Sequence, residues 1–448
     1  MKSVDVSSVV NESKFSRYHR VIVFWCCLLV FFDGIELGLI GAVATPIMGE
    51  WSLEPVQFGT VSSYSALGMI LGALIFGPLA DRISRKNTIL ISALIYSFFT
   101  LMGAFAQGII DFSVYRFIAG IGMGGIVPTT LGLITDISPR KNRAYVATFL
   151  TTFIGVGALI AGLISIYLIP AFGWRSIFIV GGLPIITIPF LIKLLPESPI
   201  ILYKKGRFEE LANLLNRLSS NKEFYSGKDK YEMLISVKTK VPFMSLFQNK
   251  EGSSTLLIWI AFFCSYLVSF GLNAWLPNIM VRAGYPLTSG LLFAVVMGLG
   301  AMIGSLTGGK IAGQLGLKKV VIWSFILGGI PLCLLSINFG SAVLLYSIFF
   351  IVGWGTIGSQ NLLLAFCSQL YPSEIRSTGL ASASIIGRLG SFTGPLFGGI
   401  ILSLNVPLNA SFVAFGIVAL IASISVMGVR SPNSRSNVNT AVNTVTEI

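Results

Sequence analysis

Apolar residues along the chain are gathered into runs that alternate with short polar segments. Twelve such runs lie at 21–47, 57–79, 87–107, 112–135, 144–169, 176–195, 256–276, 287–312, 320–337, 341–368, 378–403 and 409–429. A run of roughly 20 apolar residues is the length at which a helix crosses the hydrocarbon core of a bilayer. The pattern therefore predicts an all-α membrane protein with twelve transmembrane helices.

The composition agrees with that pattern and excludes a soluble domain. Of the 448 residues, 54% are hydrophobic and 11% are charged, and the mean hydropathy is +0.83. One globular core could not bury so much apolar surface, whereas a bilayer accepts it. The first run is too long and begins too late for a cleaved signal peptide, so we expect it to remain as a membrane span.

The polar segments divide the twelve runs into two groups of six. We predict a tail at 1–20, a first six-helix bundle at 21–195, a central loop at 196–255, a second bundle at 256–430 and a flexible tail at 431–448. Residues 219–230 of the central loop are also expected to be flexible. Just before them, apolar residues at helical spacing predict a short amphipathic helix on the inner membrane surface. These residues are Phe208, Leu211, Leu214, Leu215 and Leu218.

The basic residues favour one side of the membrane. With the amino terminus inside, the cations of 2–20, 82–86, 140–143, the central loop, 318–319 and 376 share one face, and only Arg175 and Arg282 lie outside. Such asymmetry marks the cytoplasmic face, so we expect a multi-pass protein of the cell (inner) membrane with both termini cytoplasmic. The formal net charge of +13 then reflects topology and contact with membrane lipid. Scattered loop cations do not indicate nucleic-acid binding.

Two stretches of the chain repeat one another. Four residues of the first half recur in the second at a constant offset of 233: Gly120, Gly122, Pro139 and Arg143 return as Gly353, Gly355, Pro372 and Arg376. Four matches in one register argue for two pseudo-symmetric halves.

Neither a cofactor nor a metal ion is expected. The run from Gly120 to Gly125 matches the glycine pattern of a dinucleotide-binding loop, but it lies inside an apolar helix, where close glycines favour helix packing. The five cysteines all fall within spans and lack the paired spacing of metal ligands or of a disulfide framework.

Two acidic residues lie well inside a predicted span. Asp33 and Glu36 are three residues apart, which places both on one face of the first span near the membrane midplane. An ionised carboxylate at that depth costs roughly 2.5 to 3.5 kcal/mol on insertion scales, so it must face water, pair with a cation or bind a proton. We favour proton binding, because burial and a like-charged neighbour both ease neutralisation. A fixed ion pair that stabilises the bundle is the structural alternative.

Two cations complement these acids. Arg388 lies about ten residues into the eleventh span, too deep for its guanidinium to reach either membrane surface easily. Its anionic partner is either Asp33 or Glu36, or else a substrate carboxylate that fits the guanidinium fork. Arg116 lies nearer the outer edge of its span. It is either an interfacial residue that extends to the headgroups or a participant in proton transfer or substrate entry.

Polar and aromatic residues of the seventh and tenth spans are candidates for lining a pocket. They are Asn273, Trp354, Gln360 and Asn361. Trp275 lies near the outer interface, where a tryptophan of the membrane aromatic belt is the default explanation.

A charged segment between the second and third spans resembles the signature loop of the major facilitator superfamily. It reads Gly77-Pro-Leu-Ala-Asp81-Arg82-Ile-Ser84-Arg85-Lys86. Ser84 replaces the second glycine of the family pattern. A weaker copy at 309–319 keeps the first glycine and the basic end, so the second half carries an eroded loop.

Within that superfamily, the chain resembles the aromatic acid:proton symporter family along all twelve spans. The motifs that carry the resemblance are Asp33-Gly34-x-Glu36, the 77–86 loop, Arg116 with its following glycines, Trp275-Leu276-Pro277, the segment from Tyr371 to Arg376, and Gly387-Arg388 with Gly394-Pro395. The sequence departs from the family at Ile35 and Glu36, where the family has an aromatic residue and Asp. The segment from Pro196 to Pro199 is also similar to sugar and niacin porters.

The resemblance implies a monomeric secondary transporter that takes up a small organic, aromatic carboxylate by proton symport through alternating access. Asp33 would carry the proton with support from Glu36. Arg388 would hold the carboxylate, with Arg116 and the polar residues of the seventh and tenth spans contributing to binding. An inner gate would comprise Asp81, Arg82, Arg85, Arg143, Glu374 and Arg376.

Three alternatives compete with this interpretation. The same fold could carry a sugar, polyol or niacin, or the protein could be a transport-inactive membrane sensor. An intramembrane enzyme is disfavoured, because the only histidine, His19, is in the amino-terminal tail and no serine or cysteine has a base nearby in the sequence.

Overall fold

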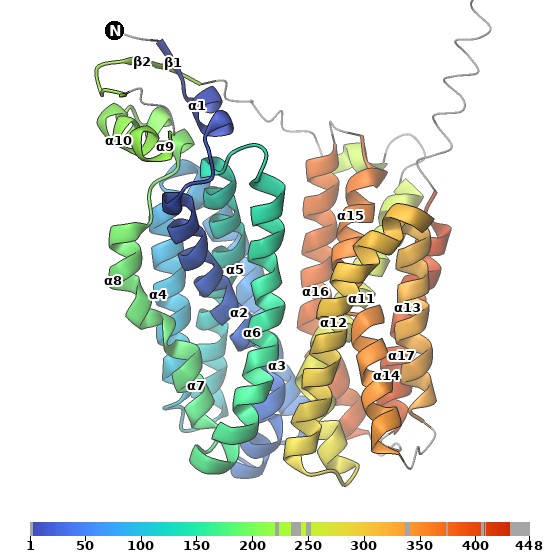
Figure 1. Ribbon diagram of the computed structural model, residues 1–448. Helices are drawn as coiled ribbons and strands as arrows, with labels where there is room; N and C mark the ends of the chain where they lie inside the picture. Colours follow the sequence, from blue (N-terminus) through green and yellow to red (C-terminus); the bar gives the residue numbers. More distant parts are fainter. Residues whose placement is uncertain are drawn as a thin grey trace, which may run out of the picture. The chain divides into compact units, whose positions relative to one another are not determined.

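Twelve helical spans long and apolar enough to cross a membrane are present in the computed structural model (Figure 1). The structure describes residues 3–219, 224–233, 243–247, 252–336, 341–372, 375–404, 407 and 409–430. The prediction of an all-α membrane protein with twelve spans is confirmed. The predicted flexible tail at 431–448 and Glu374 lie outside the described residues.

Each half of the chain contributes six of these spans, and one span in each half is broken into two helices. The first six are α2 (Arg17–Glu50), α3 (Pro55–Arg82), α4 (Arg85–Gly103), α5 (Ile109–Ile137), α6 (Arg143–Phe172), and α7 (Arg175–Gly182) with α8 (Pro184–Leu194). The second six are α11 (Gly252–Arg282), α12 (Leu287–Leu315), α13 (Leu317–Leu334), α14 (Ala342–Gly355) with α15 (Gln360–Leu370), α16 (Arg376–Ser403) and α17 (Asn409–Gly428).

Local sequence signals explain where several helices begin and end. Ser84 caps α4, because its hydroxyl oxygen accepts a hydrogen bond from the backbone N–H of Asn87 at 2.9 Å. Pro184 opens α8, where its missing N–H costs nothing. Gly173 ends α6 at a φ of +75°, a conformation that favours glycine.

The chain divides into two compact units. One comprises residues 1–238 with 276–292, and the other comprises 239–275 with 293–448. The second unit also contains the short 3-10 helix η1 (Phe243–Phe247). The predicted bundle limits, 21–195 and 256–430, stay predictions.

Helix contacts repeat between the two halves at nearly the offset that the sequence shows. A methyl group added at Gly120 of α5 would meet the Ser65 carbonyl of α3, and one added at Gly353 of α14 would meet the Met297 carbonyl of α12. Ser65 and Met297 are 232 residues apart. The guanidinium of Arg143 bonds to a carbonyl oxygen five residues earlier at 3.3 Å, and that of Arg376 does the same at 3.3 Å. The halves therefore repeat in their packing as well as in their sequence.

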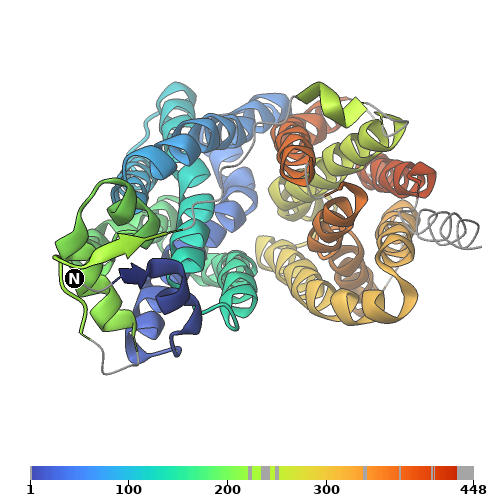
Figure 2. The same ribbon diagram turned by 90° about the horizontal axis from the view of Figure 1, so that it is seen from above.

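A small layer of secondary structure covers one end of the first unit. It consists of β1 (Ser3–Asp5), α1 (Val6–Glu12), α9 (Pro199–Lys204), α10 (Phe208–Leu218) and β2 (Lys230–Glu232). The two strands pair in parallel, with Val4 opposite Tyr231. Figure 2 shows this dark blue and green layer over the first unit. The segment predicted as an amino-terminal tail therefore contains ordered elements.

The predicted amphipathic helix is present as α10, but its apolar face packs on protein and not on the membrane surface. Leu211, Leu214, Leu215 and Leu218 are buried in one cluster with Val6 and Val10 of α1, so protein covers the apolar face. The expected flexibility of 219–230 is also wrong in its described part. Tyr225 is buried, and its backbone N–H and carbonyl both bond to the Asn216 side chain.

Candidate functional site

A buried ion pair joins α2 to α5 in the first unit. The Arg116 guanidinium pairs with the Glu36 carboxylate, and the two residues are 4% and 0% exposed. Asp33, one turn earlier on α2, is 2% exposed. Of the two alternatives for Arg116, the interfacial one is wrong, because the Glu36 carboxylate of α2 holds its guanidinium inside the bundle.

The neighbours of Glu36 come from α4 and α7. Gly181 of α7 leaves space beside the Oε2 atom of Glu36. A methyl group added at Gly181 would lie 3.4 Å from that oxygen and would also meet the side chain of Thr100 in α4. One turn of α4 away, the Tyr96 hydroxyl donates to the carbonyl oxygens of Phe32 and Gly181, at 2.9 and 3.1 Å. Four helices thus enclose this charged cluster, which is why its side chains are buried.

The second unit has apolar residues where the first has the ion pair. Gly157 of α6 packs on the carbonyl of Phe31 in α2, and Gly390 of α16 packs on the carbonyl of Phe263 in α11. Phe31 and Phe263 are therefore equivalent, so residues of α2 match residues of α11 that come 232 positions later. By that offset Val268 matches Glu36. Residues of α5 match residues of α14 that come 233 positions later, so Phe349 matches Arg116. Val268 is 1% exposed and Phe349 is 0% exposed. The matching positions of the second half are therefore buried and apolar.

Arg388 lies in the middle of α16 and is partly exposed. From residue 252 to the end, the sequence contains only two acidic residues, Glu374 and Glu447. Both lie outside the described residues, so no carboxylate in the described part of the second unit pairs with Arg388. Tyr266 of α11 is close enough for the guanidinium to act on it electrostatically.

The polar residues predicted for the pocket divide between two helix contacts. The Gln360 side-chain amide donates to the Ser269 hydroxyl at 2.8 Å and so joins α15 to α11. The Asn273 amide donates to the Ser269 carbonyl at 2.8 Å, one turn earlier on α11 itself. Trp354 and Asn361 instead bond to α12. Their partners are the hydroxyls of Thr307 at 3.0 Å and Ser305 at 2.8 Å.

The break in the tenth span lies beside these residues. Thr356–Ser359 form turns between α14 and α15, and Gln360 is the first residue of α15. Broken spans are common where a transporter binds its substrate, because the interruption places polar backbone at mid-depth. The interfacial role expected for Trp275 is wrong. Its side chain is fully buried, and its indole N–H donates to the Pro395 carbonyl at 2.7 Å.

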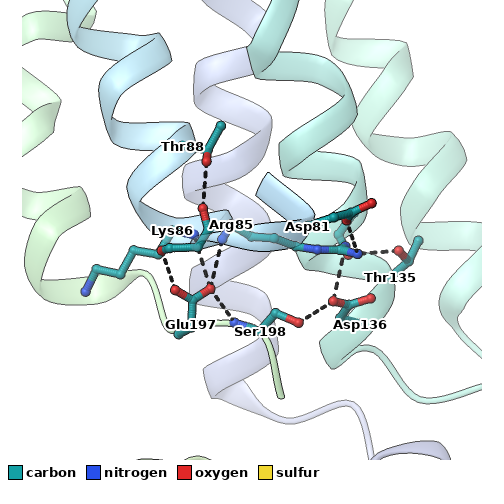
Figure 3. Close-up of polar contacts among 10 residues, drawn as sticks. Asp81, Arg85, Lys86, Thr88, Thr135, Asp136, Glu197 and Ser198 are labelled. Atoms are coloured by element: carbon teal, nitrogen blue, oxygen red, sulfur yellow. Dashed lines mark hydrogen bonds and ion pairs between the residues drawn. The ribbon is translucent and has the colours of Figure 1, made fainter. Parts of the chain in front are cut away.

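The signature loop forms a charged network at the junction of α3, α4 and α5 (Figure 3). The Arg85 guanidinium lies 3.1 Å from the Asp136 carboxylate and 3.4 Å from that of Asp81. The Asp136 side chain is 9% exposed and that of Asp81 is 64% exposed, so Asp136 is the more strongly held partner.

Glu197 completes this network from the segment after α8. Its carboxylate accepts hydrogen bonds from the Ser84 hydroxyl and from the backbone N–H groups of Arg85, Lys86 and Ser198, the last three at 3.0, 3.4 and 2.9 Å. The Ser198 hydroxyl in turn donates to Asp136. A carboxylate at the amino terminus of α4 interacts favourably with the helix dipole.

Sequence reasoning placed no gating role on Asp136, Glu197 or Ser198. The Pro196-to-Pro199 segment was visible as a motif, but nothing in the sequence brought it beside the signature loop more than 100 residues earlier. The remaining predicted gate residues lie elsewhere. Arg143 bonds to the Asn11 side chain at 3.0 Å, Arg376 bonds to a backbone carbonyl, and Arg82 is exposed.

Comparison with known families decides the affiliation of the chain. The family model described as Major Facilitator Superfamily matches residues 26–309 and 259–443. The chain belongs to the Major Facilitator Superfamily. Among solved members, the inward-open xylose transporter XylE from E. coli has a TM-score of 0.73 at 16% identity, covering 92% of this chain and 96% of that one. That similarity shows the fold alone.

Curated relatives within the superfamily align along nearly the whole chain. The benzoate transport protein of Acinetobacter baylyi is 31% identical over 95% of this chain and 92% of its own. The gallate transporter of Pseudomonas putida is 31% identical over 95% and 94%, and the niacin transporter NiaP of Acinetobacter baylyi is 30% identical over 88% and 89%. The resemblance to the aromatic acid:proton symporter family is confirmed, and the protein belongs among transporters rather than enzymes.

Proposed function

We propose that this superfamily member takes up a small aromatic carboxylate together with protons by alternating access. The carrying observation is that its relatives over more than nine-tenths of the chain are named for benzoate and gallate. We further propose that it works as a monomer in the cell membrane, with both termini cytoplasmic and without a cofactor. Niacin is itself an aromatic carboxylate, so the niacin alternative differs only in the ring.

We assign the substrate carboxylate to Arg388. A guanidinium in the middle of a span is costly unless an anion accompanies it. The described part of its own unit supplies none, and the planar fork of arginine matches a carboxylate through two parallel hydrogen bonds. Gln360 and Asn273, which share the Ser269 contact on α11, supply polar groups along the same wall.

We assign the substrate ring to Tyr266. It stacks between Phe262 and Phe270 on one face of α11, with ring centroids 6.3 Å apart on each side. A methyl group at Gly387 would lie 3.0 Å from its ring, so the glycine beside Arg388 makes room for this aromatic side chain. The residue of α2 that matches Tyr266 is Gly34, so the first unit has no aromatic side chain at this place. An aromatic surface next to a guanidinium suits a benzoate-like solute.

We assign proton coupling to Asp33 and the Glu36–Arg116 pair. The matching positions of the second half, Val268 and Phe349, are apolar and buried, which supports a role for the charges beyond packing. Protonation of Glu36 would release Arg116, and protonation of either acid removes a charge that burial penalises. Such a cluster can couple proton uptake to a change in helix packing.

We assign gating to the network of Arg85, Asp81, Asp136 and Glu197. Its ion pairs lie at the helix ends where the signature loop turns, and contacts of this kind can hold one conformation until substrate and proton shift the balance. Asp136 and Glu197 are additions to the predicted gate. Arg82, Arg143, Glu374 and Arg376 stay predictions, as do the binding roles of Trp354 and Asn361.

Uptake of radiolabelled benzoate into proteoliposomes tests this function. We expect accumulation under an inward pH gradient, and competition by gallate and nicotinate but not by xylose. Asp33→Asn should lose accumulation yet keep exchange of labelled for unlabelled benzoate, because the amide imitates the neutral acid but cannot ionise. Competition by xylose alone would overturn the substrate class, and normal accumulation by Asp33→Asn would overturn the carrier.

A further inference from the structure

We infer that a basic cavity beside α10 binds the phosphate group of an anionic phospholipid. The cavity has a volume of about 390 Å³ and is formed where α4 begins, α8 ends and α10 packs against α2. Four cations line it: Lys86, Lys193, Arg207 and Arg217. None of the residues proposed to bind substrate or protons lines it, and Glu197 of the proposed gate forms part of its wall.

The acidic residues in the cavity wall are already engaged. The Glu197 carboxylate accepts the hydrogen bonds of the α4 amino terminus, and Glu210 pairs with Arg207 at 2.5 Å. Figure 3 shows the amino group of Lys86 well away from the Glu197 carboxylate. Among the described residues, Lys86, Lys193 and Arg217 form no ion pair, so the cavity has an excess of positive charge.

Arg217 is positioned toward the membrane helix by an aromatic contact. Its guanidinium carbon lies 5.8 Å from the ring centroid of Tyr18 on α2. Lys193 belongs to the last turn of α8, at the end of the sixth span, where a helix leaves the hydrocarbon. The cations therefore stand at headgroup depth, and basic pockets at that depth on the cytoplasmic side commonly bind anionic headgroups.

A second hollow on neighbouring residues of α2 favours a lipid over a free phosphate. It is lined by Arg17, Arg20, Val21, Phe24 and Trp25, whereas Tyr18 of the same helix lines the first cavity. Tyr18, Val21 and Trp25 are three or four residues apart, so they follow one face of α2. Trp25 stacks on Phe190 of α8 at 5.8 Å, and Phe24 is 60% exposed. An acyl chain can lie along this face while its phosphate occupies the basic cavity.

Thermal unfolding of the full-length protein in detergent tests the site with three probes. These are phosphatidylglycerol, phosphatidylcholine and inorganic phosphate, each titrated separately. A ligand that binds only the folded state raises the melting temperature as its concentration exceeds the dissociation constant. We expect phosphatidylglycerol to raise it by several degrees, and the other two to have little effect. The rise should shrink at high salt, because exposed charges are screened.

Charge removal locates the binding site. The double variant Lys193→Gln with Arg217→Gln should abolish the phosphatidylglycerol shift. The control is Lys204→Gln with Lys205→Gln, which should keep the shift. Both control residues are exposed cations at the end of α9 and lie outside the cavity. If Arg217→Gln impairs folding through loss of the Tyr18 contact, Lys193→Gln alone tests the site and should reduce the shift. An equal shift with phosphatidylcholine, or a full shift in the cavity variants, overturns the proposal. Saturable stabilisation by inorganic phosphate alone would identify an ion site and overturn the lipid.

Discussion

A charged side chain at mid-depth in a membrane needs a partner, and the two halves meet that need differently. In the first unit, Glu36 and Arg116 satisfy one another within the bundle. In the second, the described residues give Arg388 no acidic partner, and a tyrosine is its electrostatic neighbour. This difference supports the two roles proposed for these sites, in which the first changes its own charge and the second receives the charge of a solute.

Replacement of Arg388 by lysine tests carboxylate recognition. Arg388→Lys keeps the positive charge but loses the planar fork, so we expect benzoate binding to weaken by roughly 10- to 100-fold, about 1.5 to 3 kcal/mol. Equilibrium binding to purified protein measures this, with monodispersity of the variant as the folding control. Binding as tight as in the parent would exclude a bidentate role.

Tyr266→Leu tests recognition of the ring separately from the carboxylate. Aromatic contacts contribute about 0.5 to 1.5 kcal/mol beyond area burial, so benzoate binding should weaken about 2- to 10-fold, while cyclohexanecarboxylate binding should change little. Tyr266→Phe should bind both acids as the parent does. The matched control is Tyr346→Leu, a tyrosine of α14 that stacks on Phe293. Equal loss of both acids in Tyr266→Leu would indicate a structural role instead.

The contacts that we propose for the gate lie at helix ends rather than in helix middles. The α4 amino terminus is held by Glu197 from the far end of the sixth span, and Arg85 in its first turn pairs with Asp136 at the last turn of α5. Three elements distant in sequence thus meet at one junction. Rigid helices make such junctions effective, because a small change at a helix end is transmitted along its length.

Glu197→Gln should loosen this junction. The amide loses the negative charge that complements the α4 dipole, so we expect about 1 to 2 kcal/mol of destabilisation and faster cysteine labelling near Asn87 in a background without native thiols. Glu210→Gln is the matched control, because its exposed ion pair with Arg207 contributes little. Unchanged labelling in Glu197→Gln would remove Glu197 from the gate.

The elements themselves could be predicted from the sequence far better than their neighbours. Hydropathy placed all twelve spans, because the bilayer imposes a length and a composition on each. It also identified Asp33, Glu36 and Arg388 as charges within spans. It did not reveal that Glu36 faces Arg116, because depth along a helix is a local property whereas its neighbours depend on how helices pack. The cover over α10 was missed for the same reason, since it comes from residues 3–12 and 225–232.

At the scale of the whole molecule, the duplication supplies an internal control for function. The two halves share helix crossings at offsets of 232 and 233, so a residue in one half shows what the fold accepts at the matching place in the other. At the places that match Glu36 and Arg116, the second half has the buried apolar residues Val268 and Phe349. The Glu36–Arg116 pair thus lies where the other half has no charge, which supports the transport role proposed for it.

The double variant Glu36→Val with Arg116→Phe tests that conclusion by copying the second half into the first. Replacement of a buried ion pair by apolar residues is often neutral for stability, whereas removal of one partner leaves an uncompensated charge and costs about 3 to 5 kcal/mol. The double variant should therefore melt near the parent, and each single variant well below it. Benzoate exchange should persist in the double variant while accumulation driven by a pH gradient disappears. Full accumulation would show that the pair serves packing alone, and a double variant less stable than both single variants would show that the two crossings are not equivalent.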